Sequence, residues 1–157
     1  MTGNAAFSPC RQYRYALWRQ WGPEPSYVLF VGLNPSTADE SHDDPTVRRC
    51  IGFARRWGYD AVCIANLFAY RTSKPKLLNI QTDPVGPDND AWLGWLGGGA
   101  ELIVVSWGCR GDYRCRAARV TAGLLGTDIM CFGKTEAGFP QHPLYLRRDA
   151  ELRPYYG

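Results

Sequence analysis

The amino-acid sequence predicts an α/β protein with three layers, α/β/α, in which helices cover both faces of a mostly parallel four-stranded sheet. Four short apolar runs, rich in β-branched residues, are distributed along the 157 residues. They are apolar at consecutive positions, as expected of strands buried on both faces. Helical patterns separate the runs, and alternation of strands and helices is typical of parallel sheets. The length suits one domain, which we expect to span residues 1–157.

The composition is that of a folded protein without a membrane segment. Hydrophobic residues make up 45% and charged residues 21%, which is usual for a globular domain. No run approaches the roughly 20 apolar residues of a membrane span, and the N-terminus lacks a basic segment followed by an apolar one. We therefore expect a cytoplasmic protein. Its net charge of +3, with arginines in clusters, permits nucleic acid as a partner without requiring it.

The six cysteines do not suggest a metal site or a disulfide framework. None of them forms a CxxC pair, and Cys63 and Cys131 lie inside apolar, strand-like runs. These spacings match no standard ligand pattern for zinc or an iron–sulfur cluster. We expect reduced cysteines that pack in the core, with no metal and no cofactor.

The N-terminal part of the chain is predicted to form an antiparallel hairpin at one edge of the sheet. Residues 11–21 alternate partly between apolar and polar residues, which places Tyr13, Tyr15 and Leu17 on one face of an edge strand. A turn of glycine and proline residues then leads into the run 27–31. This run is apolar at every position and is predicted to be a buried strand.

A helix and a second buried strand follow the loop after residue 31. Asp44 and Pro45 are a typical N-cap and first helical residue, and apolar residues then recur every three or four positions as far as Trp57. The run 61–65 is the next strand. The rest of the chain is predicted to contain, in order, a polar loop at 72–86, a helix at 87–96 that packs Trp92 and Trp95 and ends at three glycines, a strand at 101–105, a helix that carries Arg114, Arg116 and Arg119 and buries Val120, Leu124 and Leu125, and a strand at 128–132.

Polar residues follow the predicted strands at the points where they end. Asn34, Asn66 and Ser106 each come after an apolar run, and the loop at His142 follows the last one. In an open α/β sheet such loops converge on one edge, where ligands bind. The sequence contains no Walker loop, no dinucleotide-binding glycine pattern and no GxSxG elbow. The expected chemistry is therefore positioning and electrostatic stabilisation of a bound water.

Two short motifs resemble those of the uracil-DNA glycosylase superfamily. GLNPS at 32–36 is similar to the first motif, closest to the GINPG form of the mismatch-specific thymine/uracil branch, and HPLYL at 142–146 resembles the second. The longer set GLNPSTAD, DDPTVRRC, NLFAYR and HPLYL is similar, over nearly the whole chain, to a family of bacterial and phage proteins catalogued as a domain of unknown function. The resemblance to the superfamily implies a uracil-DNA-glycosylase-like fold and a monomeric DNA glycosylase without a cofactor.

The resemblance also implies roles for individual residues. Asn34 would orient the attacking water, as the asparagine of GINPG does, and His142 would hydrogen-bond the departing base or a flanking phosphate. Asn66 would bind the edge of a flipped base, and Phe68 or Tyr70 would stack on its face. The remaining expected contacts are Gly32, Leu33, Pro35, Ser36 and Ser106 with the substrate, Arg71, Lys74, Arg147 and Arg148 with DNA, and Leu144 and Tyr145 in the space that the base leaves.

The chain departs from the superfamily motifs, and the departures leave alternatives open. Ser36 replaces the second glycine of GINPG. The loop also adds Asp39, Asp43 and Asp44, one of which could activate the water in place of Asn34. A bulky modified pyrimidine of phage DNA is therefore a candidate substrate, and defence against phage is a candidate role beside repair.

Two other functions are compatible with the sequence. Asp39, Asp43 and Asp44, or the first two with His42, could bind a divalent ion in a metal-dependent nuclease or phosphohydrolase. However, these residues all lie in one loop, whereas such sites usually draw ligands from several elements, and we expect His42 to be exposed. The arginines and aromatic residues could also bind nucleic acid or a nucleotide without cleaving it.

Overall fold

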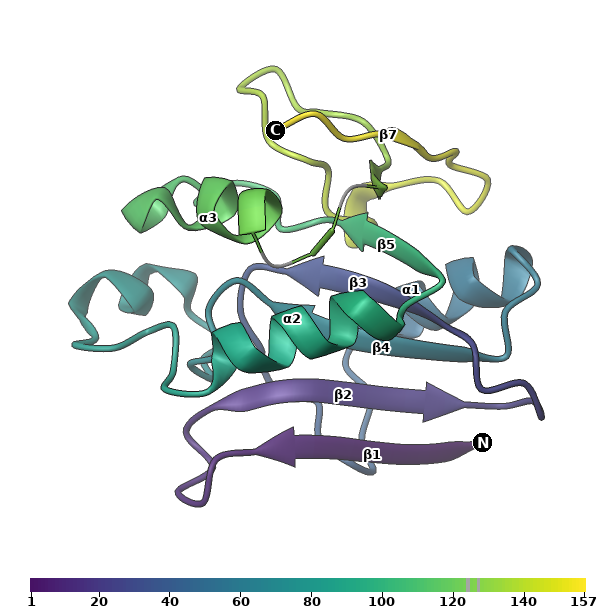
Figure 1. The fold of residues 1–157 in the computed structure, drawn as a ribbon, viewed down its shortest axis with the longest axis horizontal. Coiled ribbons are helices and arrows are strands. Elements are labelled where there is room, and N and C mark those ends of the chain that lie inside the picture. Colours follow the sequence, from purple (N-terminus) through teal and green to yellow (C-terminus); the bar gives the residue numbers. More distant parts are fainter. Residues whose placement is uncertain (124, 127) are drawn as a thin grey trace.

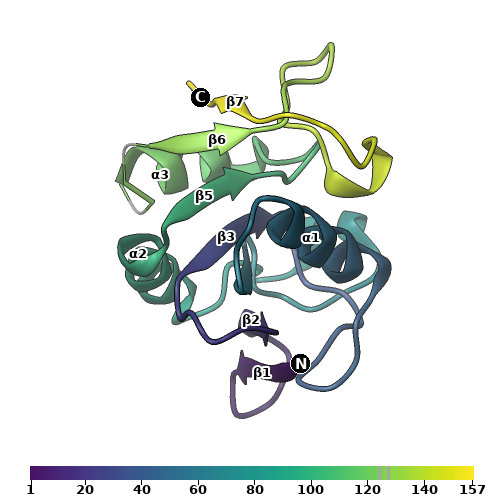
Figure 2. The same cartoon turned by 90° about the vertical axis from the view of Figure 1, so that its right-hand side faces the viewer.

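The computed structural model describes residues 1–123, 125–126 and 128–157 of the chain. Within these residues, one mixed seven-stranded sheet runs through the molecule, with helices on both of its faces (Figure 1, Figure 2). The strands, in their order across the sheet, are β1 (Thr2–Phe7), β2 (Arg14–Gln20), β4 (Ala61–Asn66), β3 (Tyr27–Gly32), β5 (Leu102–Val105), β6 (Ile129–Cys131) and β7 (Arg153–Pro154).

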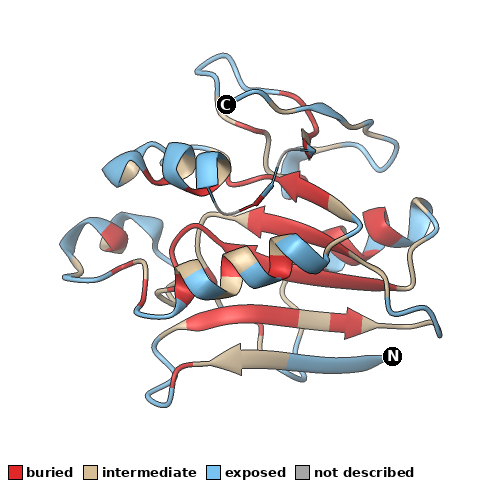
Figure 3. Cartoon of the chain, in the orientation of Figure 1, coloured by how far each residue is buried: buried red, intermediate tan, exposed pale blue. Residues whose placement is uncertain are grey.

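Four neighbouring strands in the centre of the sheet, β4, β3, β5 and β6, are parallel, which confirms the predicted parallel core. All of β4 and the middle of β3 are buried, as their continuous apolar sequences predict (Figure 3). The sheet is larger than predicted because β1 adds an antiparallel strand at one edge and β7 adds one at the other. Neither of these two sequences has the apolar pattern that identifies a strand.

The N-terminal hairpin is formed by a different pair of strands from the one predicted. β2 pairs antiparallel with β1 and, on its other side, with β4, so β4 separates β2 from β3 and β1 is the edge strand. The ladder between β1 and β2 shifts register between Ala6 and Phe7. Near this irregularity, Tyr15 stacks on Trp92 on one side of the sheet, whereas Leu17 packs in the core on the other side. The sequence predicts that Tyr15 and Leu17 share a face of the strand. They lie on opposite faces, because the irregularity breaks the two-residue alternation.

Helix α1 (Pro45–Arg56) forms as predicted and covers one face of the sheet. The carboxylate of Asp44 accepts a hydrogen bond from the backbone N–H of Val47 at 2.9 Å and caps the helix. The buried stripe of α1 packs in one core with alternate residues of β3 and β4. Helices α2 (Asn89–Gly99) and α3 (Arg116–Gly123) cover the opposite face, where a second core lies (Figure 2). The molecule therefore has three layers, α/β/α.

The sequence predicts that helix α2 stops at the three glycines that follow Leu96. The helix instead continues through them to Gly99. Leu93 and Leu96 are buried in the core and anchor the helix. The hydroxyl of Tyr27 donates to the carbonyl oxygen of Leu96 at 2.7 Å, and it lies 2.8 Å from the position that a Cβ on Gly99 would take. Glycine permits this close approach, so the tertiary contacts outweigh its low helix propensity.

Two segments that link the helices differ from prediction. The segment 72–86, predicted as a loop, contains a 3₁₀ helix (Pro75–Ile80) whose Leu78 is buried in the core. One anchoring leucine is a weak signal in a polar, proline-rich stretch. Arg114, predicted on the helix after β5, lies in the turn before α3 with a φ of 55°. The helix itself begins at Arg116.

The remaining burial predictions mostly agree with the structure. Val120 and Leu125 are buried, whereas Leu124 lies outside the described residues. Trp92 packs against neighbouring aromatic rings, but Trp95 is 67% exposed and is not part of the core. None of the helices in the described part of the chain is long and apolar enough to cross a membrane. The cysteines are all free, with Cys50, Cys63 and Cys131 buried and Cys10, Cys109 and Cys115 exposed.

Candidate functional site

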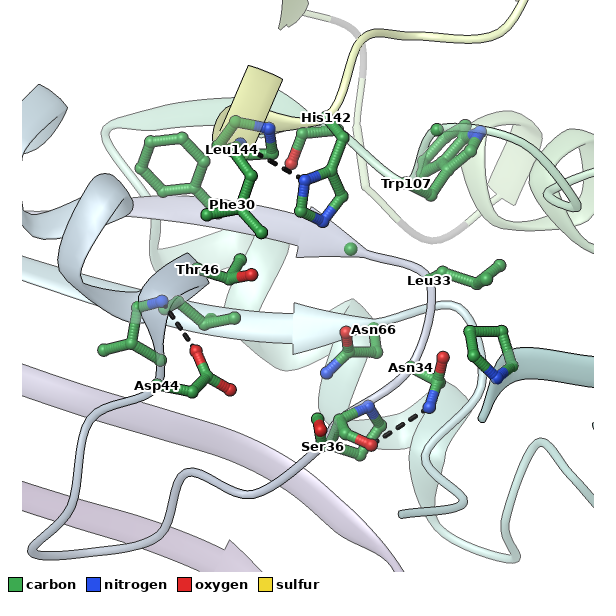
Figure 4. Close-up of a pocket in the computed structure, with 18 of the residues that line it drawn as sticks. Phe30, Leu33, Asn34, Ser36, Asp44, Thr46, Asn66, Trp107, His142 and Leu144 are labelled. Carbon is green, nitrogen blue, oxygen red and sulfur yellow. Dashed lines mark hydrogen bonds between the residues drawn. The ribbon is translucent and has the colours of Figure 1, made fainter. Parts of the chain in front are cut away.

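A cavity of about 430 Å³ opens at the carboxyl ends of β3, β4 and β5 (Figure 4). The loop after β3, the start of α1 and the turn at His142 surround it. Its volume is in the range of small-molecule sites. Asn34, Asn66, Ser106 and His142 line it together, as predicted from their positions after strands. The other predicted site residues in its lining are Gly32, Leu33, Pro35, Ser36, Asp44, Leu144 and Tyr145.

The backbone of the surrounding loops orients the side-chain amide of Asn34. Its Nδ2 group donates to the carbonyl oxygens of Pro35 at 3.0 Å and Thr72 at 2.8 Å. Both amide hydrogens are therefore used inside the protein. No described residue donates to Oδ1, which faces the cavity (Figure 4). This oxygen is an available acceptor for a water molecule.

Asn66 is the last residue of β4 and lies beside Gly32 of β3. The residue is 4% exposed, and its Nδ2 atom is buried without a hydrogen-bond partner among the described residues. A Cβ at position 32 would lie 2.9 Å from Oδ1 of Asn66, so glycine there leaves room for the amide. A buried amide donor without a partner is costly in a protein interior. The donor therefore lies at a wall of the cavity without an acceptor among the described residues.

His142 precedes a 3₁₀ turn (Pro143–Tyr145), and its Nδ1 atom accepts a hydrogen bond from the backbone N–H of Leu144 at 3.2 Å. An acceptor nitrogen carries no proton, so the neutral ring holds its proton on Nε2. Burial lowers the pKa of His142, while the charge of Asp44 acts in the opposite direction. At neutral pH the ring is therefore an uncharged donor, and its Nε2–H group points into the cavity (Figure 4).

The lowered pKa of His142 predicts how the site responds to pH. The pKa in the folded state lies below the usual 6.5. As the pH falls, the unfolded chain therefore binds the proton first, and the free energy of unfolding decreases below about pH 6.5. Protonation of Nδ1 also removes the acceptor for Leu144. For any activity that uses the neutral ring, we expect kcat/KM to be constant above about pH 7 and to fall in acid with an apparent pKa below 6.5.

His42, the second histidine, provides the control for this pH profile. Its side chain is 80% exposed and does not line the cavity. His42→Gln should therefore leave the profile unchanged, whereas His142→Gln should alter its acid limb. An inflection of the imidazole above pH 6.5, or an identical profile in His142→Gln, would contradict the prediction.

Asp44 is the only carboxylate among the described residues that line the cavity. One of its oxygens caps α1 through the backbone N–H of Val47. The other oxygen is turned toward the cavity (Figure 4). The cap thus holds the side chain in one orientation. A carboxylate held in this way can accept a proton or stabilise a positive charge on a ligand.

Arg14 lines the cavity although nothing in the sequence distinguishes it from a solvent-facing residue of an edge strand. It is 3% exposed, its Nη1 donates to the carbonyl oxygen of Ala38 at 2.9 Å, and its buried Nε has no partner among the described residues. Burial lowers the pKa of Arg14 to about 10, against the opposing effect of the Asp44 charge. It is therefore charged at neutral pH. A buried cation with an unpaired donor favours a ligand that carries acceptor atoms.

The aromatic residues Phe30, Trp107 and Tyr145 line the cavity, and the first two are almost fully buried. Phe68 and Tyr70, the two rings predicted to stack on a base, do not line it. Phe68 packs in the core beneath α2 and α3, on the other side of the sheet, and Tyr70 packs edge-on against Tyr13. The sequence does not show which aromatic rings line the cavity, because this depends on the face of the sheet to which each residue points.

Three arginines that lie outside α1 hold the loop between β3 and α1 in place through its carbonyl oxygens. Arg71, which we expect from the sequence to contact DNA, is one of them and is half-buried. Its hydrogen bonds to the loop fix the position of its side chain. The bonds run from Arg14 to Ala38, from Arg19 to Asp39 and His42, and from Arg71 to Ser36 and Thr37.

Asp39 and Asp43, two of the predicted candidate acids, lie outside the lining of the cavity. The Asp39 carboxylate accepts hydrogen bonds from the backbone N–H groups of Ser41 and His42, which hold its pKa well below the usual range and make it a poor base. Asp43 forms a salt bridge with Arg19 at 2.8 Å. Over the described ranges, no group of three or more histidine, cysteine or acidic side chains is arranged to hold a metal ion.

The other residues predicted to contact DNA lie at the rim of the cavity or beyond it. Leu144 and Tyr145 are at the rim, and Tyr145 is 86% exposed. Lys74 is exposed and precedes the 3₁₀ helix after β4, outside the lining. Arg147 forms a salt bridge with a neighbouring aspartate at 3.1 Å, and Arg148 is exposed. Leu144 and Tyr145 therefore line the cavity, whereas Lys74, Arg147 and Arg148 do not.

Arg49 of α1 joins the helix to the turn that carries His142. Its guanidinium donates to the carbonyl oxygen of Pro143 at 3.2 Å and to that of Leu146. The sequence shows Arg49 only as a member of a charged pair. In the structure it fixes one wall of the cavity against another.

Comparison with known proteins identifies a family whose model matches most of the chain. The model of a family described as Protein of unknown function (DUF1643) matches residues 14–144, which include Arg14, Asn34, Asn66 and His142. Searches of the curated proteins and of the solved structures found no match.

Proposed function

The chain belongs to the DUF1643 family, whose description states no activity, and from its cavity we propose that it is a DNA glycosylase of the uracil-DNA glycosylase superfamily. In this proposal it flips a damaged or modified pyrimidine out of DNA and hydrolyses the N-glycosidic bond, which leaves an abasic site. One observation carries the proposal. Asn34, Asp44, Asn66 and His142 line a single cavity at the carboxyl ends of parallel strands. Two of them belong to the GLNPS and HPLYL motifs.

Hydrolysis needs a positioned water and a group that accepts its proton. The Oδ1 atom of Asn34 accepts a hydrogen bond from the water and orients it, because the backbone holds both amide hydrogens. An amide is a poor base, so the carboxylate of Asp44 takes the proton. Its negative charge also stabilises the oxocarbenium-like sugar that forms as the base departs.

His142 stabilises the departing base. When the N-glycosidic bond breaks, its electron pair goes to the base, which becomes negatively charged. The Nε2–H group of the neutral ring donates to an oxygen of this base. The lowered pKa of His142 suits this role, because a neutral donor stabilises the anion without giving up its proton.

The inner end of the cavity recognises acceptor atoms. The Nδ2 of Asn66 and the Nε of Arg14 are donors without partners among the described residues. They favour a base that presents carbonyl oxygens, and they disfavour the 4-amino group of cytosine, which is itself a donor. Phe30 forms part of the apolar wall against which the base packs. The volume of about 430 Å³ leaves room for a bulky substituent on the pyrimidine.

Release of a base from DNA tests the proposed function. The protein is incubated with single-stranded and duplex oligonucleotides that contain uracil, mismatched thymine, hypoxanthine or a bulky phage-type pyrimidine, and alkali then cleaves any abasic site. We expect alkali-labile cleavage of at least one substrate, and we expect it to persist in EDTA. DNA binding without cleavage of any substrate would identify a binding protein instead. Strand cleavage that EDTA abolishes would identify a metal-dependent nuclease.

A further inference from the structure

A second cavity lies beside the first, on the outer side of α1. It has a volume of about 630 Å³ and shares Leu144 with the cavity described above. Four of its described lining residues are arginines and none is acidic. We call it the α1 groove, and its lining residues are Pro45, Arg48, Arg49, Gly52, Phe53, Arg56, Leu144 and Arg148.

Three of the arginines, Arg48, Arg56 and Arg148, are exposed and form no salt bridge with any carboxylate in the described part of the chain. Arg48 donates to the carbonyl oxygen of Asp43 at 3.0 Å, and Arg56 donates to that of Arg148 at 3.3 Å. By contrast, Arg147, which does not line the groove, is bound to a carboxylate. The groove therefore keeps three positive charges that form no salt bridge with a described residue, although the carboxylate of Asp149 interacts with Arg56 at longer range.

Gly52 lies between two of these charges. Arg48, Gly52 and Arg56 are four residues apart, so they follow one line along the helix, with about 12 Å between the first and the last. Gly52 is exposed, and a Cβ there would meet nothing within 4 Å. Glycine inside a helix is less stable than alanine, and no contact with a described residue explains it here. It keeps the floor of the groove open to the close approach of a partner.

We propose that the α1 groove binds the phosphate backbone of the DNA strand next to the flipped nucleotide. This rests on the proposed function, which puts DNA over the neighbouring cavity. The guanidinium fork matches the geometry of phosphate. Leu144 lies on the rim that the two cavities share, so a strand whose base enters the first cavity passes over the second. Contacts of this kind add affinity without sequence preference.

The salt dependence of DNA binding tests the groove. Fluorescence anisotropy is measured with a labelled DNA duplex that contains an abasic-site analogue, over a series of NaCl concentrations. In the variant Arg48→Gln/Arg56→Gln/Arg148→Gln we expect binding to weaken by about tenfold or more at low salt. The slope of log K against log salt should become shallower by about 0.9 for each phosphate that the variant no longer neutralises. Arg49 is left unchanged because it holds the turn at His142.

A matched control removes the same charge elsewhere. Arg119→Gln/Lys134→Gln/Arg153→Gln changes exposed residues that line neither cavity, and it should leave the slope unchanged. Gly52→Glu and Gly52→Ala provide a second pair of variants. The glutamate puts a negative charge on the floor of the groove and should weaken binding strongly, whereas the alanine, which adds only a Cβ there, should weaken it less and should melt at a higher temperature than the natural protein.

The outcomes separate the groove from the catalytic proposal. The groove variants are Arg48→Gln/Arg56→Gln/Arg148→Gln and Gly52→Glu. The groove proposal is overturned if the groove and control variants weaken DNA binding equally, or if both groove variants bind DNA like the natural protein. It is also overturned if the groove variants weaken binding to RNA of the same sequence but not to DNA. Base release that occurs while the groove variants bind normally refutes the groove alone. DNA binding that depends on the groove, without release of any base, refutes the glycosylase alone. No binding of the natural protein to either the duplex or the single-stranded oligonucleotide overturns both.

Discussion

Asn34→Ala is expected to lower the rate of base release by about 10²–10⁴-fold while leaving affinity for DNA little changed. The alanine has no oxygen to orient the attacking water, whereas the α1 groove and the base-binding donors of Asn66 and Arg14 are unaffected. The measurements are single-turnover release of the base and anisotropy binding to the same oligonucleotide. Loss of release with retained binding separates catalysis from recognition.

Thr37→Ala is the matched control for Asn34→Ala. Thr37 lies in the same loop and is exposed, and its side chain does not line the cavity. It should release base at the natural rate. Since Asn34→Ala also removes the bonds to Pro35 and Thr72, thermal melting of both variants is needed. An Asn34→Ala protein that is folded and fully active would refute the assigned role.

Asp44→Asn is expected to reduce base release by about 10²–10⁴-fold, because it removes the only carboxylate among the described residues that line the cavity. Asparagine caps a helix about as well as aspartate, so α1 keeps its N-cap bond to Val47. Asp44→Ala should lose the same activity. It should also lower the free energy of unfolding by about 0.5–2 kcal/mol relative to Asp44→Asn, because alanine cannot cap the helix.

The comparison of these two variants separates the chemical role of Asp44 from its structural role. Both lose the negative charge near Arg14, so the difference between them in urea unfolding reports the cap alone. Asp39→Asn serves as a further control, because Asp39 does not line the cavity. If Asp44→Asn kept full activity, the proton would have to go to a group other than Asp44.

Local patterns were sufficient for the elements that depend on neighbouring residues. Asp44 and Pro45 predict the start of α1, because a cap and a first helical residue act within one turn. Continuous apolar runs predict the parallel strands, since burial on both faces leaves no polar position. The sequence also predicts that Asn34 and Asn66 lie at one edge of the sheet, because loops after parallel strands must meet there.

Other features depended on contacts between distant parts of the chain. The sequence alone did not identify β1 as the edge strand. It placed Phe68 or Tyr70 beside the substrate, whereas the aromatic rings of Phe30, Trp107 and Tyr145 line the cavity. It did not show that Arg71, which is expected to contact DNA, holds a loop. Arg14 did not stand out at all, although it lines the cavity.

The sequence by itself therefore determined the α/β class, the parallel core and the meeting of Asn34, Asn66, Ser106 and His142 at one cavity. Only the tertiary structure decided which arginines are used inside the protein, which ring faces the cavity and which strands pair at the edge. The physical reason is the range of the interactions. Caps and apolar runs act over a few residues, whereas the register of a strand and the partner of a buried charge are set by residues far away in the chain.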